Sequence, residues 1–139
     1  MRDPKAEGRR WLKQAEYDLG TAEWLFEGER WPAACFSAQQ AAEKAIKAFL
    51  YATGKRVVTG HSVVELAREA AAKEPRFEDF EHAGAILDRF YVPTRYPNGL
   101  PGGTAADFYG KEDASGALDL ARKVVEFVRS LPVLAESED

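Results

Sequence analysis

Apolar side chains recur along the chain at the spacing of an α-helix, in five segments that glycine or proline separates. Proline lacks the N–H of a helical hydrogen bond and glycine weakens helix interiors, so these residues mark where each segment begins or ends. No segment of useful length alternates apolar and polar residues, although Val57 and Val58 can add a little extended structure. The predicted helices cover residues 5–27, 32–53, 62–73, 77–91 and 112–131. We therefore expect an all-α protein, an antiparallel up-and-down bundle of four to five helices.

The chain has the size of one domain. Its 139 residues, of which 45% are hydrophobic and 30% charged, are enough to bury a single core. We predict one helical domain over residues 1–139, with the core at about 5–131 and an acidic C-terminal tail at 133–139.

Residues 92–111 interrupt the helical pattern, because they contain three prolines and form too long a connection for a simple bundle. Loops of this length in compact domains are usually either functional or disordered. Tyr96, Phe108 and Tyr109 provide side chains that can pack against the bundle. We expect an ordered Pro/Gly-rich loop before the last helix.

Composition restricts the possible partners. No stretch approaches the roughly 18 consecutive apolar residues of a membrane span, and no secretory signal opens the chain, so we expect a cytoplasmic protein without a membrane partner. A net charge of −4 argues against general electrostatic adhesion to nucleic acid but leaves room for a local basic site. The use of a single asparagine, Asn98, is weakly typical of a thermophile. The single cysteine, Cys35, lies on an alanine-rich face and is expected to be buried.

A polar row follows the second predicted helix. Its members stand at positions i, i+3, i+4 and i+7 and are Gln40, Glu43, Lys44 and Lys47. The row is either a solvated helix face with internal ion pairs or one wall of an anion-binding site.

A second group of polar and aromatic residues stands at the end of the fourth predicted helix and consists of Asp88, Tyr91, Thr94, Arg95 and Tyr96. The planar guanidinium of Arg95 can bind a phosphate through two hydrogen bonds while a tyrosine ring stacks on a base. With Lys44 and Lys47, Arg95 can then form a phosphate-binding cleft. The alternative is that Arg95 only pairs with Asp88 or Glu43 and fixes the loop to the bundle.

His61 precedes the third predicted helix, where it can cap the helix, donate to a carboxylate or face the same cleft. His61 and His82 are the only histidines, and neither has metal-ligand neighbours at the usual spacing. We expect no metal site, and no cofactor is indicated.

Four segments together resemble the HEPN family, in the family's order and over residues from about 10 to 130. The segments are residues 11–22, residues 34–48 with Gln39-Gln40-Ala-Ala-Glu43-Lys44, His61, and residues 87–97 with Thr94-Arg95-Tyr96-Pro97. The resemblance implies a helical bundle, frequent homodimers, and a small nucleotidyltransferase as partner in a toxin–antitoxin-like pair. A homodimer is also expected from Trp24, Trp31 and Phe108, which a small bundle does not readily bury.

Many members of that family are ribonucleases that use an Arg-x4–6-His motif near the start of the last helix. This chain lacks a histidine at the permitted positions after Arg95, and Arg56 with His61 is only a fallback candidate. The leading hypothesis is therefore a nucleotide- or RNA-binding module. The alternatives are a metal-independent ribonuclease and a purely structural dimerisation subunit.

Overall fold

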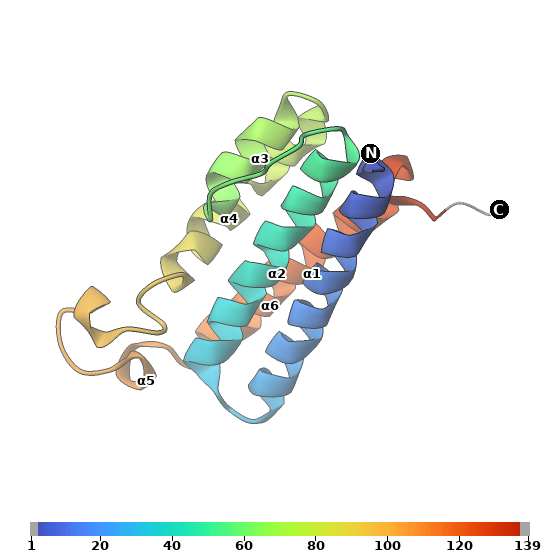
Figure 1. The fold of residues 1–139 in the computed structure, drawn as a ribbon. Helices are drawn as coiled ribbons and strands as arrows, with labels where there is room; N and C mark the ends of the chain where they lie inside the picture. Colours follow the sequence, from blue (N-terminus) through green and yellow to red (C-terminus); the bar gives the residue numbers. More distant parts are fainter. Residues whose placement is uncertain (1–2, 137–139) are drawn as a thin grey trace.

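The computed structural model describes residues 3–136, and the end of the predicted acidic tail, residues 137–139, lies outside them. The all-α prediction is confirmed, since none of the described residues forms a strand. Helices α1 (Pro4–Glu27) and α2 (Trp31–Ala52) form an antiparallel pair, and α6 (Lys111–Ser130) packs behind them (Figure 1). Helices α3 (Val63–Ala71) and α4 (Glu81–Leu87) pack along the other side of α2. No helix within residues 3–136 has the length and apolar character to cross a bilayer.

The ends of the two longest helices follow from local chemistry. The Asp3 carboxylate accepts a hydrogen bond from Lys5 N at 3.0 Å and Pro4 occupies the first position of α1, so this helix begins with a capped turn. Gly28 ends α1, and Glu29, with φ of 59°, turns the chain into α2. Gly8 allows the two helices to approach closely, because a Cβ there would lie 2.5 Å from Ala52 Cβ and 2.7 Å from Ala48 O.

Helix α2 is the central element of the core, and its alanines let neighbouring helices pack closely around it. The predicted burial of Cys35 is confirmed, because its side chain has no exposed surface. Burial raises the pKa of the Cys35 thiol to about 12. This cysteine is therefore a packing residue of the core rather than a reactive nucleophile.

The fourth predicted helix is present, but it does not extend over all of residues 77–91. This segment divides into η1 (Pro75–Phe80), α4, and η2 (Asp88–Phe90), where η denotes a 3₁₀ turn. Phe77 explains the division: its ring is fully buried and lies 4.7 Å from that of Phe49 and 5.1 Å from that of Phe127. In the tighter 3₁₀ turn, apolar residues three positions apart still lie on one face. This spacing had suggested an α-helix.

Short helical turns build the long loop between η2 and α6. They are η3 (Pro97–Gly99) and α5 (Ala105–Phe108), and the Asp107 carboxylate accepts hydrogen bonds from Thr104 N at 2.9 Å and Thr104 Oγ1 at 3.3 Å at the start of α5. Tyr109 packs its ring 5.7 Å from that of Phe90, which attaches the end of the loop to the core.

The core extends beyond its predicted end at residue 131. Helix α6 is followed by η4 (Pro132–Leu134), and the side chain of Leu134 is only 3% exposed. The tail predicted from residue 133 is therefore wrong at its start, because an apolar side chain still contacts the bundle there.

Candidate functional site

Asp88 connects the start of α3 to η2. Its carboxylate accepts hydrogen bonds from Ser62 Oγ at 2.8 Å, Val63 N at 2.7 Å and Val64 N at 3.2 Å. A carboxylate at a helix N-terminus satisfies free N–H groups and interacts favourably with the helix dipole. Asp88 is thus a structural anchor that holds the segment before α3 against η2.

Gln39 fixes the backbone beside this anchor. Its side chain is fully buried, and its Nε2 donates to the His61 carbonyl at 2.9 Å. Its Oε1 accepts from Gln40 Nε2 at 2.8 Å. The sequence analysis did not select Gln39 as a site residue, although a glutamine on an alanine-rich face was a signal of a buried polar role.

Glu43 links the buried polar residues of α2 to His61. It is 2% exposed, and its Oε2 lies 3.1 Å from Lys47 Nζ. Its Oε1 lies 3.3 Å from Gln40 Nε2 and 3.5 Å from His61 Nδ1. The interpretation of this row as a solvated face is wrong for Glu43 and Lys47, because α1 covers α2 here.

The two lysines of the row are already neutralised. Lys47 is 5% exposed, pairs with Glu43 and lies 5.8 Å from the Trp11 ring centroid. Lys44 Nζ lies 2.7 Å from Asp18 Oδ2 on α1. Both ammonium groups therefore stabilise the seam between α1 and α2, and neither joins Arg95 in the cleft expected from the sequence.

Arg95 remains without a counter-ion among residues 3–136. Its Nε donates to the Tyr91 carbonyl at 2.8 Å, and its guanidinium lies 4.3 Å, 4.8 Å and 5.2 Å from the ring centroids of Phe36, Tyr91 and Tyr96. The expected alternative, in which Arg95 pairs with Asp88 or Glu43, is wrong because other partners occupy both carboxylates.

His61 and this arginine both contact the Tyr91 ring. The imidazole of His61 stacks on that ring with a centroid distance of 5.1 Å and an interplanar angle of 15°, and the His61 side chain is 60% exposed. We call Phe36, His61, Tyr91, Arg95 and Tyr96 the Arg95 cluster. The cluster combines an unneutralised cation, an exposed imidazole and aromatic rings, which are groups that bind phosphates and stack on bases.

Two further residues predicted for the site, Thr94 and Arg56, form no hydrogen bond, ion pair or ring contact with the side chains of this cluster. Thr94 is buried, and its hydroxyl donates to the Phe90 carbonyl, so it supports the backbone. The side chain of Arg56 is exposed and forms no hydrogen bond, ion pair or ring contact with residues 3–136. Phe36, which the sequence analysis did not select, is the ring nearest to the Arg95 guanidinium.

Solved structures resemble this chain over most of its length. The protein TT1696 from Thermus thermophilus is 41% identical, with a TM-score of 0.79 over 88% of this chain and 96% of that one. The archaeal HEPN homologue ST0689 is 32% identical, with a TM-score of 0.73 over 88% of this chain and 95% of that one. A HEPN domain protein from Thermotoga maritima is 28% identical, with a TM-score of 0.68 over 86% and 94% of the two chains.

Sequence comparison agrees with these structures. A protein of Methanocaldococcus jannaschii named Putative toxin MJ1304 is 31% identical over 127 residues, which are 85% of this chain and 83% of that protein. The HEPN domain family matches residues 9–131. That match runs from within α1 to just past the end of α6, and with these relatives it shows that the chain belongs to the HEPN domain family.

Proposed function

We propose that this chain is a cytoplasmic nucleotide- or RNA-binding module whose ligand contacts the Arg95 cluster. The observation that carries the proposal is the exposed guanidinium, which has no counter-ion among the described residues and lies over three aromatic rings. Its Nε donates to the Tyr91 carbonyl, and none of the described residues accepts a hydrogen bond from its two terminal amino groups.

In this proposal three members of the cluster contact the ligand. Arg95 donates hydrogen bonds to a phosphate, and the exposed imidazole of His61 supplies a further donor beside it. The ring of Tyr96, which is 53% exposed, offers a surface on which a base stacks. The buried Gln39 and Glu43 and the half-buried Asp88 hold these groups in place.

The partner in this proposal is a small nucleotidyltransferase, with which the chain forms a toxin–antitoxin-like pair. Similarity to a protein named Putative toxin MJ1304 supports the toxin-like role. Co-expression with the nucleotidyltransferase tests the pairing, and the expected result is that the two chains elute together in gel filtration. Separate elution at micromolar concentration contradicts it.

Binding is tested with a fluorescent single-stranded RNA hexamer and with ADP. We expect Arg95→Ala to weaken binding roughly ten- to hundredfold, because removal of a charged hydrogen bond commonly costs about 1.5–3 kcal/mol. Arg30→Ala is the matched control, since Arg30 is an exposed arginine at the turn between α1 and α2. Equal affinity of parent and Arg95→Ala removes Arg95 as a ligand, and absence of binding by the parent favours the purely structural subunit.

A second candidate is a metal-independent ribonuclease, and the contact of Glu43 with His61 favours it. A buried carboxylate beside one ring nitrogen orients the imidazole and leaves its other nitrogen available for proton transfer. In this reaction the ribose 2′-hydroxyl attacks the phosphorus and gives its proton to His61, while the bond from the phosphorus to the 5′-oxygen breaks and this oxygen takes a proton from water. Arg95 then balances the charge on the phosphate oxygens.

Cleavage of RNA in the presence of a chelator tests this candidate. The expected products carry 2′,3′-cyclic phosphate ends, and the activity is expected to disappear in His61→Ala. Arg56→Ala is expected to retain it, because the exposed Arg56 side chain forms no hydrogen bond, ion pair or ring contact with the described residues. Activity that survives in His61→Ala contradicts the assignment.

A further inference from the structure

The side of α1 that faces away from the bundle carries two large exposed rings. Tyr17 and Trp24 are 72% and 76% exposed, and neither forms a ring contact with any of residues 3–136. They are seven residues apart, which is two turns of an α-helix, so both project from the same side of α1. This helix lies at the edge of the bundle and packs against α2, α6 and η4, which leaves that side open (Figure 1).

Two cations extend the same side of the helix toward its N-terminus. Arg10 and Lys13 precede Tyr17 by seven and four residues, and this spacing places all three on one helix face. Lys13 is exposed and forms no ion pair with the described residues. The Arg10 side chain is 77% exposed, although its Nη1 lies 3.7 Å from Glu7 Oε2. We call Arg10, Lys13, Tyr17 and Trp24 the α1 outer face.

No carboxylate interrupts this face, because the three acidic residues between positions 10 and 24 are directed to other helices. Their ion pairs join Glu16 to Arg129 at 2.9 Å, Asp18 to Lys44 at 2.7 Å and Glu23 to Arg122 at 3.8 Å. The next carboxylate, Glu27, follows Trp24 by three residues and limits the face at its aromatic end. In a chain with a net charge of −4, the α1 outer face is thus a local surface of cations and aromatic rings.

We propose that the α1 outer face binds single-stranded RNA, with phosphates at Arg10 and Lys13 and bases stacked on Tyr17 and Trp24. The inference rests on the proposed function and extends it, because it names an RNA strand rather than a single nucleotide as the ligand. Proteins bind single strands by stacking bases on aromatic side chains beside cations that follow the backbone. The face is about 21 Å long at 1.5 Å per residue, which is the length of about six stacked nucleotides.

The residues between the two rings favour a base over a protein segment. Positions 20 and 21 are Gly20 and Thr21, and a Cβ added at Gly20 would have no heavy atom within 4 Å, so the space beside the rings is open. A helix that docks in a protein groove presents several apolar anchors three and four residues apart. The α1 outer face has no aliphatic side chain, whereas a flat base needs only a ring on which to stack.

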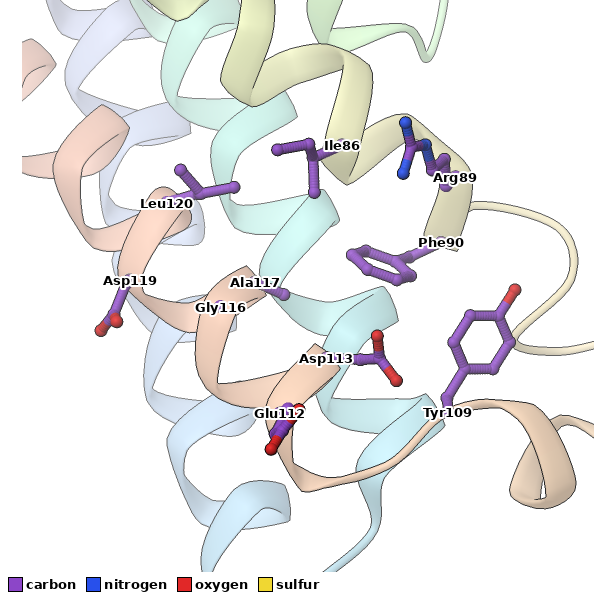
Figure 2. Close-up of a pocket in the computed structure, with 10 residues that line it drawn as sticks. All are labelled: Ile86, Arg89, Phe90, Tyr109, Glu112, Asp113, Gly116, Ala117, Asp119 and Leu120. Carbon is purple, nitrogen blue, oxygen red and sulfur yellow. The ribbon is translucent and has the colours of Figure 1, made fainter.

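A groove between α4–η2 and the first turns of α6 has the opposite character. Its volume is about 560 Å³, and Glu112, Asp113 and Asp119 lie around it (Figure 2). Arg89 is the one cation among its described lining residues. Because carboxylates repel phosphates, an RNA backbone is not expected there, and this side of the molecule provides positions for control variants.

Fluorescence anisotropy with a labelled, unpaired RNA strand of about 12 nucleotides tests the aromatic part of the face. The double variant Tyr17→Ala with Trp24→Ala is expected to bind at least tenfold more weakly, because two stacking surfaces are lost. Trp24→Phe keeps a ring and is expected to retain most of the affinity. Phe108→Ala removes a 47% exposed ring on α5 and is the control, with unchanged affinity expected.

The salt dependence of the same binding tests the cations. Arg10→Gln with Lys13→Gln is expected to make the plot of log affinity against log salt shallower by about 1.4, since each phosphate contact on a single strand contributes about 0.7. Arg89→Gln with Lys111→Gln changes the net charge equally at exposed positions away from α1, and its slope is expected to equal that of the parent.

Unchanged affinity in the Tyr17 and Trp24 double variant overturns the inference, and so does an unchanged salt slope in the Arg10 and Lys13 variant. Sedimentation velocity provides a further check: a change of oligomeric state in the aromatic variant would assign the face to a protein contact instead. Arg95→Ala separates the inference from the proposed function. Loss of RNA binding only in Arg95→Ala refutes the α1 outer face, loss only in the α1 variants refutes the Arg95 cluster, and a parent that binds no RNA refutes both.

Discussion

Two charged regions of the molecule meet at Glu43, and they differ in how their cations are neutralised. In the α1–α2 seam, Lys44 pairs with Asp18 and Lys47 with Glu43, and these side chains are largely buried. In the Arg95 cluster, the guanidinium lies over aromatic rings without a carboxylate partner among the described residues. Positive charge alone therefore does not mark a ligand site, because the lysines of the seam already have carboxylate partners.

The largest effect is expected from breaking the buried pair of the seam. Glu43→Ala leaves the Lys47 ammonium buried without its counter-ion, and such changes typically cost about 3–5 kcal/mol. Urea unfolding followed by circular dichroism measures the loss. Lys44→Met is the comparison, and it is expected to cost less because Lys44 retains 24% side-chain exposure. Equal losses in the two variants would contradict the distinction between buried and partly exposed pairs.

Contacts between residues far apart in sequence limit what the sequence alone predicts about the site. Periodicity selected Gln40, Glu43 and Lys47 as one helical row, which is correct, but it carried no information about which helix would cover them. Asp88 and Arg95 looked like partners because they are close in sequence. In the structure Asp88 instead contacts Ser62, Val63 and Val64 at the start of α3, which are more distant in sequence than Arg95 is.

The fold was more predictable than the site, because local signals determine most of it. Proline and glycine placed the ends of α1, α2 and α6 within a few residues of their observed positions. The fourth helix was predicted too long because apolar residues three apart, Phe77 and Phe80, fit both an α-helix and a 3₁₀ turn. The packing of Phe77 among other aromatic rings, which sequence does not show, selects the 3₁₀ turn.

Asp88 is connected to the α1–α2 seam and to the Arg95 cluster only through other residues. Its removal should lower both the stability of the fold and the affinity for RNA. Asp88→Ala leaves two backbone N–H groups of α3 without their acceptor, and we expect a loss of roughly 2–3 kcal/mol. Because Asp88 holds the His61 segment, RNA affinity is expected to fall as well. Asp79→Ala, on the exposed part of η1, is the control and is expected to change neither quantity. Unchanged affinity in a destabilised Asp88→Ala would separate the anchor from the cluster.

A smaller effect is expected where α1 and α2 approach each other. Gly8→Ala places a methyl group against Ala52 and the Ala48 carbonyl, and overpacking of this kind costs about 1–3 kcal/mol. Gly20→Ala is the matched control on the same helix, because an added Cβ there has no neighbour within 4 Å. It is expected to stabilise the protein by about 0.5–1 kcal/mol through helix propensity. The melting temperatures should therefore move in opposite directions.

The smallest change in stability is expected for Arg95→Lys, in the Arg95 cluster itself. This substitution should nevertheless have a clear effect on binding. Arg95→Lys keeps the positive charge but loses the planar guanidinium that lies over Phe36, Tyr91 and Tyr96. An exposed cation–π contact contributes about 0.5–1 kcal/mol, and the lysine retains part of it, so the melting temperature should shift little. RNA affinity should fall between those of the parent and Arg95→Ala, because an ammonium still attracts phosphate but does not bind it in a bidentate manner. If Arg95→Lys instead destabilises the fold as strongly as Glu43→Ala, Arg95 belongs with the seam as a structural residue, and the contrast between the two regions is wrong.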